Sequence, residues 1–113
     1  MSNTVNGVGR YLPTTVAGMR PRPDIEIATY GGPRVFRGKR VLDIGTGDGR
    51  LALGAAPWAR LVVGLDPDPT AIRGARANAR RMGASNARFR VAAAQRLPFP
   101  DGSFDVVLLS WAL

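Results

Sequence analysis

From residue 39 onwards, short apolar runs alternate with stretches of helical character. Each run is bounded by glycine, proline or polar residues, which is typical of short strands in a folded core. The runs span residues 40–44, 61–65, 88–92 and 104–109. Strands that are mostly apolar throughout and alternate with helices indicate a parallel sheet that is covered on both faces.

The segments between the first three strands predict two helices. Residues 48–56 favour a helix that Pro57 ends. A longer helix is expected over residues 69–82. Asp68 precedes it as a preferred N-cap residue, the proline at its first position costs no hydrogen bond, and Gly83 is a natural C-cap.

Residues 1–38 have a different composition. They hold six glycines and four prolines and show little periodicity, so we expect an irregular N-terminal arm. Residues 24–30 within this arm fit either a helical turn or a strand. The folded unit is expected to span residues 39–113.

The composition excludes several chemistries. The chain has no cysteine and no histidine, so it cannot form a disulfide, a thiolate zinc site or a Ser-His-Asp triad by itself. We therefore expect no metal centre. The net charge of +8 makes nucleic acid a candidate partner. Fifteen of the sixteen basic residues are arginine, but they are scattered along the chain, which favours solvated surface positions over a phosphate-binding site.

The sequence also bears on location. Residues 1–10 lack a basic start followed by an apolar stretch, and no apolar run approaches the ~20 residues that a membrane span needs. We therefore expect a cytoplasmic protein that does not contact membranes.

The segment that carries chemistry is a glycine-rich turn after the first strand. Gly45, Gly47 and Gly49 stand between that strand and the first helix. Glycines are needed there because the turn is tight and a ligand must approach the backbone closely. Asp66 ends the second strand 19 residues after Gly47, where a carboxylate can accept both hydroxyls of a ribose. Asp43 adds a second carboxylate beneath the turn.

The glycine spacing separates the candidate ligands. A dinucleotide fingerprint would place its third glycine at position 50, which is Arg50, and the chain has no phosphate-binding P-loop sequence. A carboxylate at Asp43 followed by alternate glycines suits a ligand with a cationic amino-acid tail better than a pyrophosphate.

The run from Asp43 to Gly49, together with Asp66 and residues 97–109, resembles the class I S-adenosylmethionine-dependent methyltransferases. Residues 97–109 are similar to the small-molecule branch of that family, the methyltransferase type 11-like proteins. The resemblance covers residues 39–113. It implies the cofactor-binding part of a Rossmann-like, doubly wound parallel sheet, with strands in the order 3-2-1-4 and helices on both faces.

The resemblance also implies S-adenosylmethionine as cofactor and a role for individual residues. The loop beside its methionine part would consist of Gly45, Thr46, Gly47 and Gly49. Asp43 would lie near the cofactor's amino group, Asp66 would bind the ribose hydroxyls, and Pro67 would pack against the adenine.

Adenine recognition departs from the family pattern. Ala93 stands where family members often have an aspartate, so Ala94, through its backbone N–H, and Gln95 are the candidates for the adenine edge. Ser110 would lie near the sulfonium. No residue of the chain is assigned as a catalytic base.

Three functions remain open at this point. The first is methyl transfer to a small-molecule acceptor, the second is a nucleic-acid methyltransferase or RNA-binding fragment, and the third is a non-catalytic fragment that binds a nucleoside. The family sheet has seven strands in the order 3-2-1-4-5-7-6, and this chain carries four of them. We therefore expect a truncated form whose strand 104–109 is an unpaired apolar edge, open to association.

Overall fold

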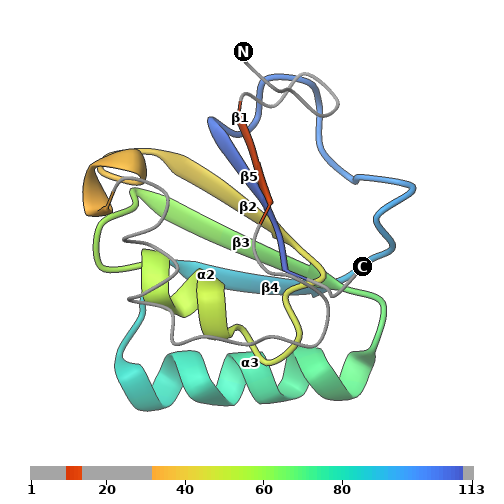
Figure 1. Cartoon of the computed structure of the whole chain (residues 1–113). Helices are drawn as coiled ribbons and strands as arrows, with labels where there is room; N and C mark the ends of the chain where they lie inside the picture. The colour runs from red at the N-terminus through yellow and green to blue at the C-terminus, as the bar shows by residue number, and fades with distance from the viewer. Residues whose placement is uncertain (1–9, 14–31, 111–113) are drawn as a thin grey trace.

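The computed structural model describes residues 10–13 and 32–110, and its centre is a parallel sheet in the order β1-β5-β2-β3-β4 (Figure 1). All four strand pairings are parallel. The strands are β1 (Arg10–Pro13), β2 (Arg40–Ile44), β3 (Leu61–Asp66), β4 (Ala87–Val91) and β5 (Val106–Leu109). The predicted order 3-2-1-4 corresponds to β4-β3-β2-β5 and is confirmed.

In the part of the chain that the structure describes, two α-helices and one 3-10 turn, η1 (Pro33–Val35), connect the strands. Helix α3 (Pro69–Met82) has the predicted caps, because Asp68 accepts a hydrogen bond from the Thr70 N–H and Gly83 adopts the left-handed conformation. Helix α2 (Arg50–Ala55) starts two residues later than predicted, since Gly49 before it has a φ of 84° that a helix cannot contain. Within the described ranges, no helix has both the length and the apolar character to cross a membrane.

The two faces of the sheet are covered differently. On one face, side chains of α2 and α3 such as Leu51 and Ile72 form a buried cluster with Val41 and Val62. On the other face, Leu42 and Leu65 belong to a second cluster that is covered by side chains of residues 92–104. Figure 1 shows α2 and α3 on the same side of the strands.

Helices were expected on both faces, and the described residues have them on one. The connection from β4 to β5 covers the other face without forming a helix. It carries Pro98, Pro100 and the Asp101-Gly102 pair, which favour turns and interrupt helices. Its aromatic residues still supply the core, because Phe104 is buried and its ring meets that of Phe99 edge to face, with centroids 5.0 Å apart.

The N-terminal arm differs from its prediction in two places. Strand β1 pairs with β5 from Arg10 opposite Val106 to Pro13 opposite Leu109, so the prediction of an unpaired edge on 104–109 is wrong. Turn η1 leads into Phe36, which is fully buried in the cluster with α2. A four-residue strand that includes a proline gives almost no signal in a sequence. Residues 24–30 lie outside the described residues.

Candidate functional site

The turn from β2 into α2 is fastened to the end of β3. The N–H groups of Gly45 and Thr46 both donate to the Leu65 carbonyl oxygen, each at 2.8 Å. Gly45 and Gly47 have φ values of 74° and 58°, which residues with a Cβ rarely adopt. The turn is therefore tight, as the glycine pattern predicts, and it folds back over the last residues of β3.

Asp66 connects this turn to the loop that follows β3. Its Oδ2 accepts from the Gly47 N–H at 2.9 Å, and its Oδ1 accepts from the Asp68 N–H at 2.9 Å. A carboxylate has about four lone-pair sites, so each oxygen keeps capacity for a further donor. The two backbone amides hold the carboxylate in one orientation, in which it can accept hydrogen bonds from the hydroxyl groups of a ligand.

A cavity of about 480 Å³ lies at the carboxyl ends of β2, β3 and β4, the place where open α/β sheets bind ligands. Five residues predicted for cofactor binding line it: Gly45, Asp66, Pro67, Ala94 and Gln95. Its remaining lining residues are apolar: Ile44, Ala92 and Ala93. A pocket with apolar walls and one carboxylate suits a nucleoside, which has a flat ring and a diol.

The other predicted polar side chains, those of Asp43, Thr46 and Ser110, bond to one another and do not line this cavity. The Asp43 carboxylate is fully buried, and its Oδ2 accepts from the Thr46 hydroxyl at 2.7 Å. Its Oδ1 accepts from the Ser110 hydroxyl, while the Ser110 N–H donates to the Ile44 carbonyl oxygen at 2.9 Å. Asp43 thus joins the glycine turn to the end of β5. Its contact with a cofactor amino group stays a prediction.

Gly49 serves packing between α2, α3 and β4. A Cβ at this position would lie 3.0 Å from the Phe89 ring and 3.2 Å from the Cβ of Ala75. Gly49 therefore contributes to packing in the core, in addition to its predicted role beside the methionine part of a cofactor.

Gly64, in the middle of β3, supports the site although no motif in the sequence pointed to it. A Cβ there would lie 2.6 Å from the Phe89 ring and 2.6 Å from the Thr46 hydroxyl oxygen. Gly64 therefore leaves the room that the turn needs in order to reach Asp43. A glycine inside an apolar strand is the signal that could have identified it, because such a residue often marks a close approach of other groups.

The turn and the cavity fit the cofactor that the resemblance implies. A Cβ at Gly47 would meet no heavy atom within 4 Å, so the space above the turn is open to a ligand. Asp66 stands beside that space with spare acceptor sites. No cluster of three or more His, Cys, Asp or Glu residues that could hold a metal ion occurs among the described residues.

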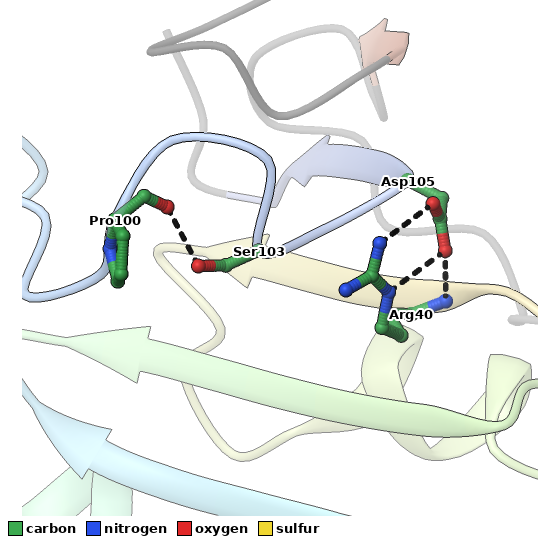
Figure 2. A network of polar contacts seen from close by, with 4 residues as sticks. All are labelled: Arg40, Pro100, Ser103 and Asp105. Atoms are coloured by element: carbon green, nitrogen blue, oxygen red, sulfur yellow. Dashed lines mark hydrogen bonds and ion pairs between the residues drawn. The ribbon is translucent and has the colours of Figure 1, made fainter.

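A polar contact at the opposite end of β2 fixes the connection that lines the cavity. Figure 2 shows Arg40 donating from its backbone N and its Nε to Asp105 Oδ2, at 2.9 and 3.2 Å, and from Nη2 to Oδ1 at 3.1 Å. The Arg40 guanidinium holds the pKa of the Asp105 carboxyl below its ordinary value through these hydrogen bonds. Nearby, the Ser103 hydroxyl donates to the Pro100 carbonyl oxygen at 2.6 Å.

Comparison with known proteins gives a consistent result. Residues 41–113 match the family model described as "Methyltransferase domain". Over 73 residues the chain is 40% identical to the "Uncharacterized methyltransferase YcgJ" of Bacillus subtilis, which covers 65% of this chain and 29% of that protein. The crystal structure of YcgJ aligns with a TM-score of 0.69 at 35% identity, over 78% of this chain and 36% of that one. The Rossmann-like sheet predicted from the sequence is thereby confirmed.

Two further relatives extend the comparison. The chain is 46% identical over 76 residues to the "Demethylmenaquinone methyltransferase" of Thermus thermophilus, which covers 65% of this chain and 34% of that protein. A SAM-dependent methyltransferase structure from Methanosarcina mazei aligns with a TM-score of 0.57 at 37% identity, over 63% of this chain and 36% of that one. The chain spans about a third of the length of the curated relatives that it matches.

Proposed function

Because this chain belongs to the methyltransferase domain family, we propose that it binds S-adenosylmethionine in the cavity at the ends of β2, β3 and β4 and takes part in methyl transfer to a small molecule. The single observation that carries the proposal is the orientation of Asp66. Two backbone amides fix its carboxylate at the wall of a cavity of about 480 Å³, and its remaining lone pairs stay available to a diol.

The chain's own residues would divide the binding as follows. Asp66 would accept the ribose hydroxyls, and Pro67 would lie against the adenine ring. The backbone N–H of Ala94 and the side chain of Gln95 would meet the adenine edge, since Ala93 brings no carboxylate to that wall.

Gly45 and Gly47 would let the amino-acid part of the cofactor approach the backbone of the turn. Asp43, Thr46 and Ser110 would keep that turn in place from below. When bound, the cofactor supplies an electrophilic methyl group on a sulfonium. The protein contributes position and electrostatics.

The small-molecule acceptor is the preferred class for two reasons. Residues 97–109 resemble the small-molecule branch of the family, and one relative is by its name a demethylmenaquinone methyltransferase. A methyltransferase acting on nucleic acid, and a nucleoside-binding fragment without catalysis, are the alternatives. We also propose the cytoplasm as the location, which fractionation of cells producing the full protein tests.

Calorimetry with S-adenosylhomocysteine tests the binding step. We expect the wild-type chain to bind and Asp66→Asn to bind on the order of ten- to a hundredfold more weakly, as for the loss of hydrogen bonds to a charged group. Asp101→Asn, at an exposed turn, is the matched control and should bind like the wild type. Absence of binding by the wild type, or an unchanged affinity of a folded Asp66→Asn variant, would contradict the cofactor assignment.

A transfer assay distinguishes the three functions. The chain is incubated with S-adenosylmethionine that carries tritium in its methyl group, together with a mixture of demethylated quinols and total RNA. Label in the organic extract supports the proposal, and label in the RNA supports the nucleic-acid alternative. Binding of S-adenosylhomocysteine without label in either fraction favours the third function, a fragment that binds the cofactor but does not transfer its methyl group to these acceptors.

A further inference from the structure

A second cavity, of about 630 Å³, lies along the outer edge of the sheet, between α3 and β4. Arg76 and Arg80 line it from α3, and Arg88 and Arg90 line it from β4. No aspartate or glutamate is among its lining residues. We call this cavity the edge groove. It shares no lining residue with the cofactor cavity, so it needs a separate explanation.

The arginines of the edge groove bond to neutral groups. Arg76 Nη2 donates to the Phe89 carbonyl oxygen at 2.8 Å, and Arg88 Nη1 donates to the carbonyl oxygens of Ser85 and Ala87. These acceptors are neutral groups. Among the described residues, no ion pair joins any of the four lining arginines to an acidic side chain, in contrast to Arg40 and Asp105.

The negative end of the α3 dipole offsets only part of this positive charge. The groove runs along the C-terminal half of α3, where the helix dipole is equivalent to roughly half a negative charge. Arg76, Arg80 and Arg88 bring three full positive charges to the same place. Arg90 stands apart from this sum, because its guanidinium lies 5.6 Å from the centre of the Phe99 ring. A clear excess of positive charge remains.

The contact of Arg76 also restricts the kind of partner. The Phe89 carbonyl oxygen is the acceptor that an added strand would use at the edge of β4, and Arg76 already bonds to it. Pairing of an extended acidic peptide with β4 is therefore obstructed. A ligand in the groove would meet guanidinium groups, which bind phosphate oxygens with two parallel hydrogen bonds.

We propose that the edge groove binds the phosphate backbone of a single-stranded nucleic acid. Arg76 and Arg80 lie one helical turn apart, about 6 Å along the axis, so they can contact successive phosphates of one extended strand. Arg88 lines the groove from β4, where its Nη1 is held by the Ser85 and Ala87 carbonyl oxygens, and alanines such as Ala79 give the groove an apolar floor for sugars or bases.

Fluorescence anisotropy with a labelled RNA of about 12 nucleotides tests the proposal on the full chain. The test variant is Arg80→Gln combined with Arg88→Gln, which retains Arg76 and its bond to β4. The control is Arg34→Gln combined with Arg60→Gln, two exposed positions outside the groove that carry the same loss of charge. Single-stranded DNA of the same sequence is run in parallel, because it presents the same phosphates. Thermal unfolding by circular dichroism confirms that the variants are folded.

We expect the groove variant to bind RNA about tenfold more weakly than the control at low salt. The slope of log affinity against log salt should also fall by about 1.4, as for two lost phosphate contacts on a single strand.

Similar affinity for DNA would assign recognition to the phosphates, and preference for RNA would add a contact to the 2′-hydroxyl. An equal loss in groove and control variants, no binding by the wild type at about 20 mM salt, or tighter binding of a labelled oligoglutamate than of RNA would overturn the proposal. Because S-adenosylhomocysteine binding is measured separately, failure here leaves the proposed methyl transfer unaffected.

Discussion

Gly64 of β3 faces the ring of Phe89 on β4 so closely that a Cβ on Gly64 would lie 2.6 Å from that ring. The same Cβ would lie 2.6 Å from the Thr46 hydroxyl oxygen in the glycine-rich turn. The lack of a Cβ at Gly64 therefore makes room both for the packing of the core and for the turn of the candidate cofactor site. The position of the turn depends on a residue that never reaches the ligand cavity.

Gly64→Ala should destabilise the protein and weaken cofactor binding together. Overpacking of a core costs typically 1–3 kcal/mol, and here the ring of Phe89 and the Thr46 side chain must both move. Gly74→Ala is the matched control, because a Cβ there meets no heavy atom within 4 Å and α3 should gain roughly 0.5–1 kcal/mol. Urea unfolding measures the change in stability of each variant, and calorimetry with S-adenosylhomocysteine measures the change in cofactor binding. Equal stability of the two variants would contradict the close packing at Gly64.

Ser110→Ala should destabilise the protein through Asp43. The buried Asp43 carboxylate loses one of the two hydroxyl donors that the described residues provide, and the loss of a hydrogen bond to a buried charged group costs about 1–3 kcal/mol. Ser103→Ala removes a hydroxyl from an exposed turn and should stay within roughly 0.5 kcal/mol of the wild type.

A double-mutant cycle of Ser110→Ala with Thr46→Val should be non-additive, since both hydroxyls bond to the same carboxylate. The free energies of unfolding measure the cycle. Strictly additive effects would show that the two hydroxyls do not share Asp43.

The sequence is sufficient to predict the parts of the fold that depend on local pattern. Asp68, Pro69 and Gly83 define the ends of α3, and glycines followed by Asp66 predict which strand ends form the ligand cavity. These signals arise from capping and turn chemistry, which act over a few residues.

Other features depend on contacts between distant segments and have no local signal. Strand β1 is defined only by its pairing with β5, which lies almost a hundred residues further along the chain. The role of Gly64 becomes visible only once Phe89 packs against it. The arginines of the edge groove appear scattered in sequence, and the packing of α3 beside β4 gathers them. Long-range packing therefore determines the pairing of β1, the role of Gly64 and the grouping of the arginines, which the sequence pattern does not predict.

Asp105 should make stability depend on acid. Hydrogen bonds from Arg40 lower the pKa of its carboxyl below the ordinary value of 3.8, so the folded state favours the ionised form. The contribution of Asp105 to the free energy of unfolding is fully present at pH values above 3.8. It is lost as the pH falls through the lower folded-state pKa of the carboxyl. Asp105→Asn should therefore lower the urea midpoint at pH 7, and its difference from the wild type should close in strong acid.

The control for this pH dependence is Asp101→Asn, which removes an exposed carboxylate outside the Arg40 contact. Its difference from the wild type should be small at every pH. Arg40 stays charged throughout the range, so it adds no titration of its own. A constant difference between Asp105→Asn and the wild type from pH 7 to pH 2 would contradict the ion pair.

Removal of residues 1–13 should make the protein associate. Strand β1 supplies the parallel partner along the outer edge of β5, from Val106 to Leu109. Without it, the backbone N–H and C=O groups on that edge of a nearly continuous apolar strand lose their partners, and such an edge pairs readily with another chain. We expect the shortened chain to run as a dimer or larger species in size-exclusion chromatography with light scattering.

The matched control exchanges Arg10 to Pro13 for four glycines, which retains the length but weakens strand formation, and it should associate to a lesser degree. A shortened chain that stays monomeric and as stable as the full chain would show that β1 contributes nothing to covering this edge.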